Sequence, residues 1–577
     1  MKPVLLIISA LITAIFIYAF TTPKTPAQFD FETYKTKNII SCNPSWGQIE
    51  RALEEMEIPP MPGAGNYKWK IRTKSDSAQF YFNQGINMYY GFHSIEAKAS
   101  FNKAAKFDGE NPLIWWAIAL SYGPNINDMG YVIPPMANEA TKKAFSLIDK
   151  ATPLEKLLIT AIQDRYIEDS VYDKKELNKA YSKTMQKIYM QYPGNADVAA
   201  LYAEGLMLEH PWDYWNKDST HQSWTPQIMK VLERVIQKSP DHPGANHYYI
   251  HVMEASPYAA RALPSADRLG RLTPGLSHMV HMPSHIYLRT GHFDKGSAVN
   301  AASVVKFNEY KNLFPAVNEN PFLYQFHNQH MQINCSLMAG NFASTLKTSN
   351  DLKNSFDTAM LSMPPPFGNF IQYWYHTPTL TFVHFGKWKQ ILQLSKPAGH
   401  HTYANILYHF SRGMAFANTG KTGEAWEEEM LMQKFFNDPS LLVPIENFSP
   451  IIEAAKSAKM LLSGTIYLRE NNITEAIEHL KQAVEFDEKM IYTEPRDWML
   501  NPKQYLGTAY LYAKQWQKAE QSFRRDLNQN KNNIWSLYGL HQALVKQNKN
   551  VTAASIQKKL NIARSKSDLT SFRLISN

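Results

Sequence analysis

Cysteine is scarce in this sequence of 577 residues, which contains only Cys42 and Cys335. Two thiols so far apart exclude a disulfide framework, a CxxCH haem attachment site and an iron–sulfur cluster bound by four nearby cysteines, so no haem is expected. Runs of like charge are lacking as well, because 60 basic and 51 acidic residues are mixed along the chain. A nucleic-acid partner is therefore not expected.

Several common catalytic motifs are missing too. There is no HExxH for a zinc protease and no GxSxG for a serine hydrolase. The segment ANTGKT, residues 417–422, lacks the first glycine of a phosphate-binding loop and fits a turn between helices. No nucleotide cofactor is therefore expected.

The N-terminus carries a predominantly apolar run from Val4 to Phe20, preceded by Lys2. Its length is long for the apolar part of a signal peptide and just sufficient to span a bilayer. We expect residues 1–22 to be a hydrophobic anchor or signal, with a buried helix as the alternative, and residues 23–44 to be a linker. An anchor or signal predicts a protein that is held in a membrane facing the periplasm or exterior, or exported.

The body of the chain is globular in composition, with 44% hydrophobic and 19% charged residues. Within it, a glycine is repeatedly followed twelve residues later by an alanine, as in the pairs Gly85 and Ala97, Gly464 and Ala476, and Gly507 and Ala519. A large residue follows four positions after each alanine. Small residues at these places let two antiparallel helices approach, while larger side chains fill the gap to the next pair.

This spacing resembles the tetratricopeptide repeat (TPR) pattern. Longer phrases, among them HPGANHYYIHVMEASP and HMPSHIYLRTG, resemble a group of large bacterial TPR proteins without a settled function, and the matching phrases run from about residue 80 to 545. The resemblance implies an all-α, TPR-type superhelical array of antiparallel helix pairs behind the N-terminal segment. We expect N-terminal repeats in 45–240, histidine-rich repeats in 241–400 and C-terminal repeats in 401–570.

Histidines recur at one position of the repeat frame. Counting ten residues back from four successive turns gives His247, His281, His330 and His376. Four residues after these stand His251, His285, Asn334 and Leu380, and three residues before them stand Gly244, His278, His327 and Tyr373. Offsets of three and four residues share one helix face, so the histidines form a stripe on neighbouring helices. In the resembling family, these positions of the first helices face a concave groove.

Imidazoles that converge with a carboxylate are the usual donors for a transition metal. The predicted metal ligands are His247, His251, Glu254, His278, His281, His285, His327 and His330. Residues of second rank, which would support the site, are His376, Arg289, Glu209, His210 and Asn334. So many donors fit two metal ions, or one ion with additional acid–base histidines. Copper is the first expectation, from the imidazole donors and the expected export, followed by zinc or iron.

Two alternatives remain open for the stripe: a metal-free groove for an anionic or peptide ligand, or plain structural packing. Pro283 interrupts the first helix of its unit, so residues 278–282 are expected to form a turn and the helix to begin near Pro283. His278 would then come from a loop. His93 and His292 fall in turns between helices and are expected to face solvent, so that replacing either should not affect the site.

The sequence therefore predicts a TPR-fold metalloprotein, whose most specific form is a metal-dependent redox enzyme acting on a small substrate in the groove. The alternative is a non-enzymatic scaffold that binds a peptide or protein partner in the cell envelope. Whether the protein is an enzyme stays open at this stage.

Overall fold

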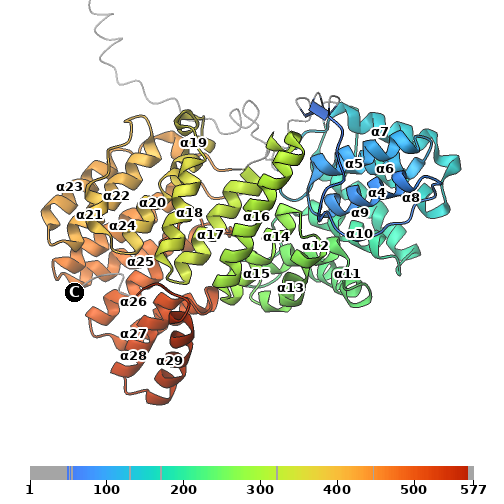
Figure 1. Cartoon of the computed structure of the whole chain (residues 1–577). Coiled ribbons are helices and arrows are strands. Elements are labelled where there is room, and N and C mark those ends of the chain that lie inside the picture. The colour runs from blue at the N-terminus through green and yellow to red at the C-terminus, as the bar shows by residue number, and fades with distance from the viewer. Residues whose placement is uncertain are drawn as a thin grey trace, which may run out of the picture. The chain divides into compact units, whose positions relative to one another are not determined.

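The computed structural model describes residues 49–50, 52–53, 56–128, 131–168, 172–319, 322–445 and 448–569. Across these ranges the regular elements are helices, apart from one isolated bridge between Trp215 and His221. The all-α prediction is therefore confirmed (Figure 1). The predicted anchor at 1–22, the linker at 23–44 and Cys42 lie outside the described residues.

The predicted location requires a correction. None of the helices in the described part of the chain is long and apolar enough to cross a membrane. The expectation of a protein anchored in a membrane or exported is overturned on this finding.

The helices follow one another as short pairs. In the N-terminal part they are α4 (Asp76–Tyr90), α5 (Ser94–Phe107), α6 (Pro112–Ser121), α7 (Pro135–Ser146), α8 (Pro153–Gln163), α9 (Lys174–Gln191), α10 (Ala196–Glu209) and α11 (Thr225–Lys238). The histidine-rich part contains α12 (Pro243–Glu254), α13 (Leu263–Leu272), α14 (Ser277–His281), α15 (Pro283–Thr290), α16 (Phe293–Leu313), α17 (His327–Met338), α18 (Phe342–Asn354), α19 (Phe367–Tyr375), α20 (Thr377–His384) and α21 (Trp388–Leu392). The C-terminal part contains α22 (Thr402–Asn418), α23 (Thr422–Gln433), α24 (Ile452–Arg469), α25 (Ile473–Lys489), α26 (Pro502–Tyr512), α27 (Trp516–Gln529), α28 (Ile534–Lys546) and α29 (Asn550–Arg564).

The predicted close approach of paired helices is present. A Cβ atom added to Gly85 in α4 would lie 2.5 Å from the ring of Phe101 in α5. One added to Gly507 in α26 would lie 2.7 Å from the ring of Phe523 in α27. Both glycines therefore exist to let an aromatic side chain of the second helix contact the backbone of the first, as the repeat pattern indicated.

Pro283 divides the first helix of its unit, as predicted. α15 begins at Pro283, which needs no hydrogen bond to its nitrogen at this first helical position. The preceding residues differ from the prediction, because Ser277–His281 form the short helix α14 rather than a turn. His278 and His281 consequently lie on one short helix and His285 on the next.

The hydrophobic core is divided into separate clusters, and the two large ones meet in the sequence close to the histidines. Buried side chains of the described residues form one large cluster within 49–324, another within 326–560 and a small third one. The predicted domain limits at residues 240 and 400 stay predictions. The C-terminal helices also return to the middle of the chain, because the Trp535 indole of α28 donates a 2.9 Å hydrogen bond to the Leu337 carbonyl of α17.

Candidate metal centre

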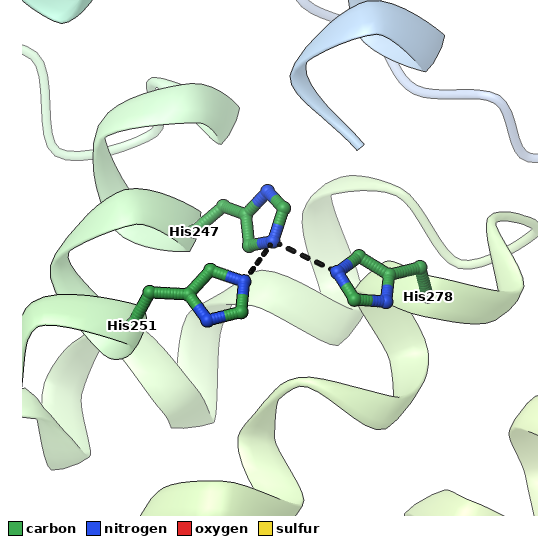
Figure 2. Close-up of side chains that lie close together, drawn as sticks. All are labelled: His247, His251 and His278. Atoms are coloured by element: carbon green, nitrogen blue, oxygen red, sulfur yellow. Dashed lines mark hydrogen bonds between the residues drawn. The ribbon is translucent and has the colours of Figure 1, made fainter. Parts of the chain in front are cut away.

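Six histidine side chains converge in two groups of three. The first triad is His247, His251 and His278, and the second triad is His281, His285 and His327. Within each triad the potential ligand atoms lie within 4.8 Å of one another. In the first, the Nε2 atom of His247 lies 3.1 Å from Nε2 of His251 and 3.1 Å from Nε2 of His278 (Figure 2).

The second triad repeats this geometry. The Nε2 atom of His281 lies 2.9 Å from Nε2 of His285 and 3.1 Å from Nε2 of His327. Two imidazole nitrogens bound to one ion at about 2.0–2.1 Å in a tetrahedral arrangement stand roughly 3.3–3.4 Å apart. The observed separations are close to those of ligands around a shared ion.

Both triads follow one construction. Each takes two histidines four residues apart from one repeat unit and a third from the next unit. The third lies three residues before the histidine that recurs in the repeat frame: His278 precedes His281, and His327 precedes His330. The same spacing in the next unit would join His330 and Asn334 with Tyr373. Only one of these is a histidine, so there is no third complete triad at this spacing.

Hydrogen bonds orient the rings of the first triad. His242 caps the start of α12, and its Nδ1 accepts a 3.1 Å hydrogen bond from the Ala245 amide. One turn later, His247 Nδ1 donates to the carbonyl oxygen of Tyr90, 2.6 Å away. A carbonyl can only accept, so the hydrogen is on Nδ1 and Nε2 of the neutral ring carries a lone pair. His251 Nδ1 faces a carboxylate oxygen of Glu254 at 3.5 Å, which favours the same tautomer.

The second triad is held by a different set of acceptors. His281 Nδ1 donates to Oδ1 of Asn300 at 2.6 Å, and the orientation of that amide is fixed because its nitrogen donates to the Gly296 carbonyl. His285 Nδ1 lies 2.9 Å from Glu254 Oε2 and 2.7 Å from Glu494 Oε2. These three side chains also form a third group whose ligand atoms lie close enough together to hold an ion. Glu254 contacts Nδ1 of one histidine in each triad, and its role as a metal ligand stays a prediction.

The charges differ between the triads as well. Burial lowers the pKa of His247, His278 and His281 well below its usual value, so these rings stay neutral. Burial also acts to lower the pKa of His285, but the carboxylates of Glu254 and Glu494 outweigh it and raise that pKa to about 10. In the absence of metal, the second triad therefore contains one positively charged ring.

Five of the six histidines are buried rather than in an open groove, which corrects for them the expectation carried over from the resembling family, while His327 is partly buried. His247 and His281 are fully buried, and His285 is only 3% exposed. The triads are also neighbours, since the ring centroids of His278 and His281 lie 5.9 Å apart. Lone pairs that meet in a buried space with no water are costly unless a hydrogen or a cation lies between them.

Other predicted residues lie outside the triads. Asn334 donates to the backbone carbonyl of His330 within its own helix, at 3.0 Å. His210 stacks on Trp224 with ring centroids 3.6 Å apart, at the end of the helix that contains Glu209. His376 lies at the junction of α19 and α20, with its ring against Tyr375. The structure does not bring these residues to the ring nitrogens of the triads.

Arg289 does reach the site, as a support. Its Nε donates to the backbone carbonyl of Glu254 at 3.0 Å and lies 4.0 Å from Glu494 Oε1. A second guanidinium nitrogen donates to the Gln529 carbonyl at 3.1 Å. Arg289 therefore ties the end of α12 to the C-terminal repeats next to the second triad.

Sequence reasoning missed three contributors. Glu494 lies between α25 and α26, 209 residues beyond the histidine that it contacts. Phe92 stacks on His278 at 5.5 Å, and the carbonyl of Tyr90 fixes His247. No local motif marks Glu494, and a backbone carbonyl has no sequence signal at all. The spacing rule of the triads becomes apparent only once the structure shows which histidines of neighbouring units meet.

The expectation for His93 was wrong. Its side chain is 1% exposed, and its Nδ1 lies 2.8 Å from a carboxylate oxygen of Glu96. The ring stacks on Tyr324 with centroids 4.6 Å apart, and its Nε2 accepts a 3.3 Å hydrogen bond from the backbone amide of His278. His93 therefore positions the helix that presents His278. His292 is only partly buried, and its Nδ1 lies 2.8 Å from the hydroxyl of Thr290.

A cavity of about 210 Å³ borders both triads. Two histidines of each triad line it, namely His251 and His278 of the first and His285 and His327 of the second. Much of the remaining wall is aromatic. A dry cavity of ~150 Å³ accepts a molecule the size of benzene, so this space suits a small organic molecule beside the ring nitrogens.

Comparison with known proteins adds little about function. No family model and no curated protein matches the chain. It is similar to the structure of the human IFIT1 dimer with m7Gppp-AAAA, with 13% identity over 85% of this chain and 91% of that one and a TM-score of 0.28. It is also similar to the Cut9–Hcn1 hetero-tetramer of APC/C, with 11% identity over 86% of this chain and 80% of that one and a TM-score of 0.33. The similarity to yeast Tom70 has 12% identity over 84% of this chain and 93% of that one, with a TM-score of 0.27.

These three structures are helical repeat proteins of the TPR type. Likenesses this distant carry no argument about activity or partners. The description of the chain as an array of helix pairs rests on its own packing, and the resemblance to the bacterial group stays a prediction.

Proposed function

We propose that this chain is a metalloprotein that binds two transition-metal ions, one in each histidine triad. The observation that carries the proposal is the double convergence of three imidazole nitrogens. In four of the six rings, those of His247, His251, His281 and His285, Nδ1 faces an oxygen acceptor, which leaves Nε2 for a metal. Such acceptors behind the ligands are the usual companions of metal-bound histidine.

Copper stays the first expectation, because the affinity of such sites for divalent ions peaks at copper. Neutral imidazoles suit copper, zinc and iron. Two carboxylates, those of Glu254 and Glu494, also form a group with His285 that could hold an ion. The earlier argument from export no longer applies, so the preference rests on the donors alone. When bound, two neighbouring copper or iron ions would supply single-electron chemistry, whereas zinc would supply only a Lewis acid.

The chain itself would contribute positioning and exclusion of water. The acceptors behind the rings hold the imidazoles in a fixed direction, and the cavity places a small molecule against both triads. A redox enzyme acting on a small organic substrate is the function that this arrangement supports best. The fold also supports a scaffold that binds a protein partner. However, the burial of the histidines disfavours their direct contact with such a partner.

Metal content tests the proposal. The purified chain, after reconstitution with copper, zinc or iron, should contain two ions by elemental analysis. His251→Ala should abolish binding in the first triad and His285→Ala in the second, each leaving one ion. His292→Ala, which changes a partly buried histidine in the turn between α15 and α16, should keep both.

Circular dichroism and thermal unfolding of the same variants check that the helices persist. A wild-type chain that takes up no stoichiometric metal would favour the scaffold. Full metal occupancy in all three variants would show that the triads are structural, and so would unfolding of both His251→Ala and His285→Ala.

A further inference from the structure

His330 occupies the recurring repeat position but has no triad to join. By the spacing rule, its companions would be Asn334 and Tyr373, neither of which is a histidine. The ring is 5% exposed, packs edge-on against Tyr373 with centroids 5.5 Å apart, and lines the cavity beside the triads. His330 therefore stands at the same repeat position as His247 and His281, but it lines the cavity rather than joining a triad.

The hydrogen on this ring can be assigned. The Trp374 indole, which can only donate, donates to Nδ1 of His330 at 3.2 Å. Burial lowers the pKa of His330 to about 3, so the ring is neutral and its single hydrogen is on Nε2. That Nε2 is buried and has no hydrogen-bond partner among the described residues. The cavity wall therefore contains a buried donor without an acceptor.

An acceptor lines the same cavity. Asp497 receives a 3.1 Å hydrogen bond from the Thr493 hydroxyl on Oδ1, while its buried Oδ2 has no partner among the residues that the structure describes. Burial raises the pKa of this carboxyl to about 7. A ligand hydroxyl can accept from the lone donor of His330, and it can also donate to an acceptor of the wall.

The other residues that line the cavity indicate what kind of molecule would bear this hydroxyl. Trp212, Phe367, Phe370, Phe448 and Tyr492 surround the space together with aliphatic side chains. Aromatic walls of this kind favour a flat ring in stacked or edge-on contact. The volume admits a single ring more readily than a large ligand.

We infer that the cavity binds a small phenol-like molecule, with its ring against the aromatic wall and its hydroxyl oxygen accepting from His330 Nε2. As the substrate of the metal centre, this molecule rests on the proposed function. Its binding does not, because the cavity and His330 are features of the chain without metal. Since the same cavity touches both triads, the bound ring would lie next to the histidines that hold the ions.

Phenol and toluene serve as a matched pair of probes, because they differ only in the hydroxyl. Their affinities for the full chain, with and without metal, are measured by calorimetry. Phenol should bind about tenfold more tightly than toluene. His330→Phe should remove that difference and leave toluene binding unchanged, whereas His330→Gln, which keeps a donor, should restore part of it. His376→Phe, outside the cavity lining, is the matched control.

The outcomes separate the two proposals. Phenol binding that is lost in His330→Phe, in a chain that holds no metal after reconstitution, would support the cavity inference and sink the metal function. Two bound ions with no binding of either probe would leave the metal function standing and overturn the inference. Equal affinities of phenol and toluene, or phenol binding that His330→Phe does not change, would also overturn it. Circular dichroism of each variant excludes unfolding as the cause.

Discussion

The two triads share one construction but differ in what stands behind their rings. In the first, a backbone carbonyl orients His247, and Glu254 approaches His251 only at 3.5 Å. In the second, an amide orients His281, and two carboxylates contact Nδ1 of His285. A neutral carbonyl fixes direction, whereas a carboxylate also increases the electron density of the ligand and offsets the charge of the metal. Once His285 has lost its proton, the second triad should therefore bind the same ion more tightly.

The supports also come from opposite ends of the described chain. The carbonyl of Tyr90 belongs to the end of α4, while Glu494 precedes α26 (Figure 1). The histidines themselves lie between these segments. The first triad consequently depends on the packing of the N-terminal repeats, and the second on the return of the C-terminal repeats to α17. We therefore predict that a substitution in one of these supporting segments lowers the metal affinity of one triad and leaves that of the other unchanged.

The largest effect is expected from Glu254→Ala, because this residue contacts one histidine of each triad. Loss of the short contact to His285 should weaken metal binding in the second triad by about 10- to 100-fold. The longer contact to His251 predicts a smaller loss in the first. Each affinity is measured by chelator competition in a chain with one triad left, using His285→Ala to isolate the first and His251→Ala the second. Equal losses in both would contradict the asymmetry.

Glu494→Ala should act on the second triad only. It removes one of the two carboxylates at His285, so we expect a loss of about tenfold in metal affinity there. The first triad, isolated by His285→Ala, should be unchanged. Glu488→Ala removes a half-buried acid of the neighbouring α25, which pairs with Lys503 and Arg525, and should change neither affinity. A loss in the first triad would indicate that Glu494 acts through the fold rather than through His285.

Helix periodicity was sufficient to predict the helical fold and part of the histidine site. The rest of the site depends on tertiary packing. The pairs His247 with His251 and His281 with His285 follow from residues four apart sharing a helix face. Their third partners depend on how neighbouring units rotate against each other, so His330 was grouped with the ligands. His278 was expected from a loop because Pro283 interrupts the first helix of its unit. Burial could not be predicted from the repeat frame, because later segments cover the histidines. Glu494 joins the site only through tertiary packing.

The smallest effect is expected from His93→Ala, which should weaken the first triad alone. His93 does not reach a metal position; it accepts a hydrogen bond from the His278 amide and stacks on Tyr324. Its loss should let α14 shift and reduce metal affinity by a few fold, because ligand direction rather than ligand identity changes. The affinity of the first triad is measured in the His285→Ala chain, with His292→Ala as the matched histidine control. An unchanged affinity would restore the first expectation that His93 is irrelevant to the site. A loss that appears equally in the second triad would trace the effect to general destabilisation, which thermal unfolding of the same variant would register.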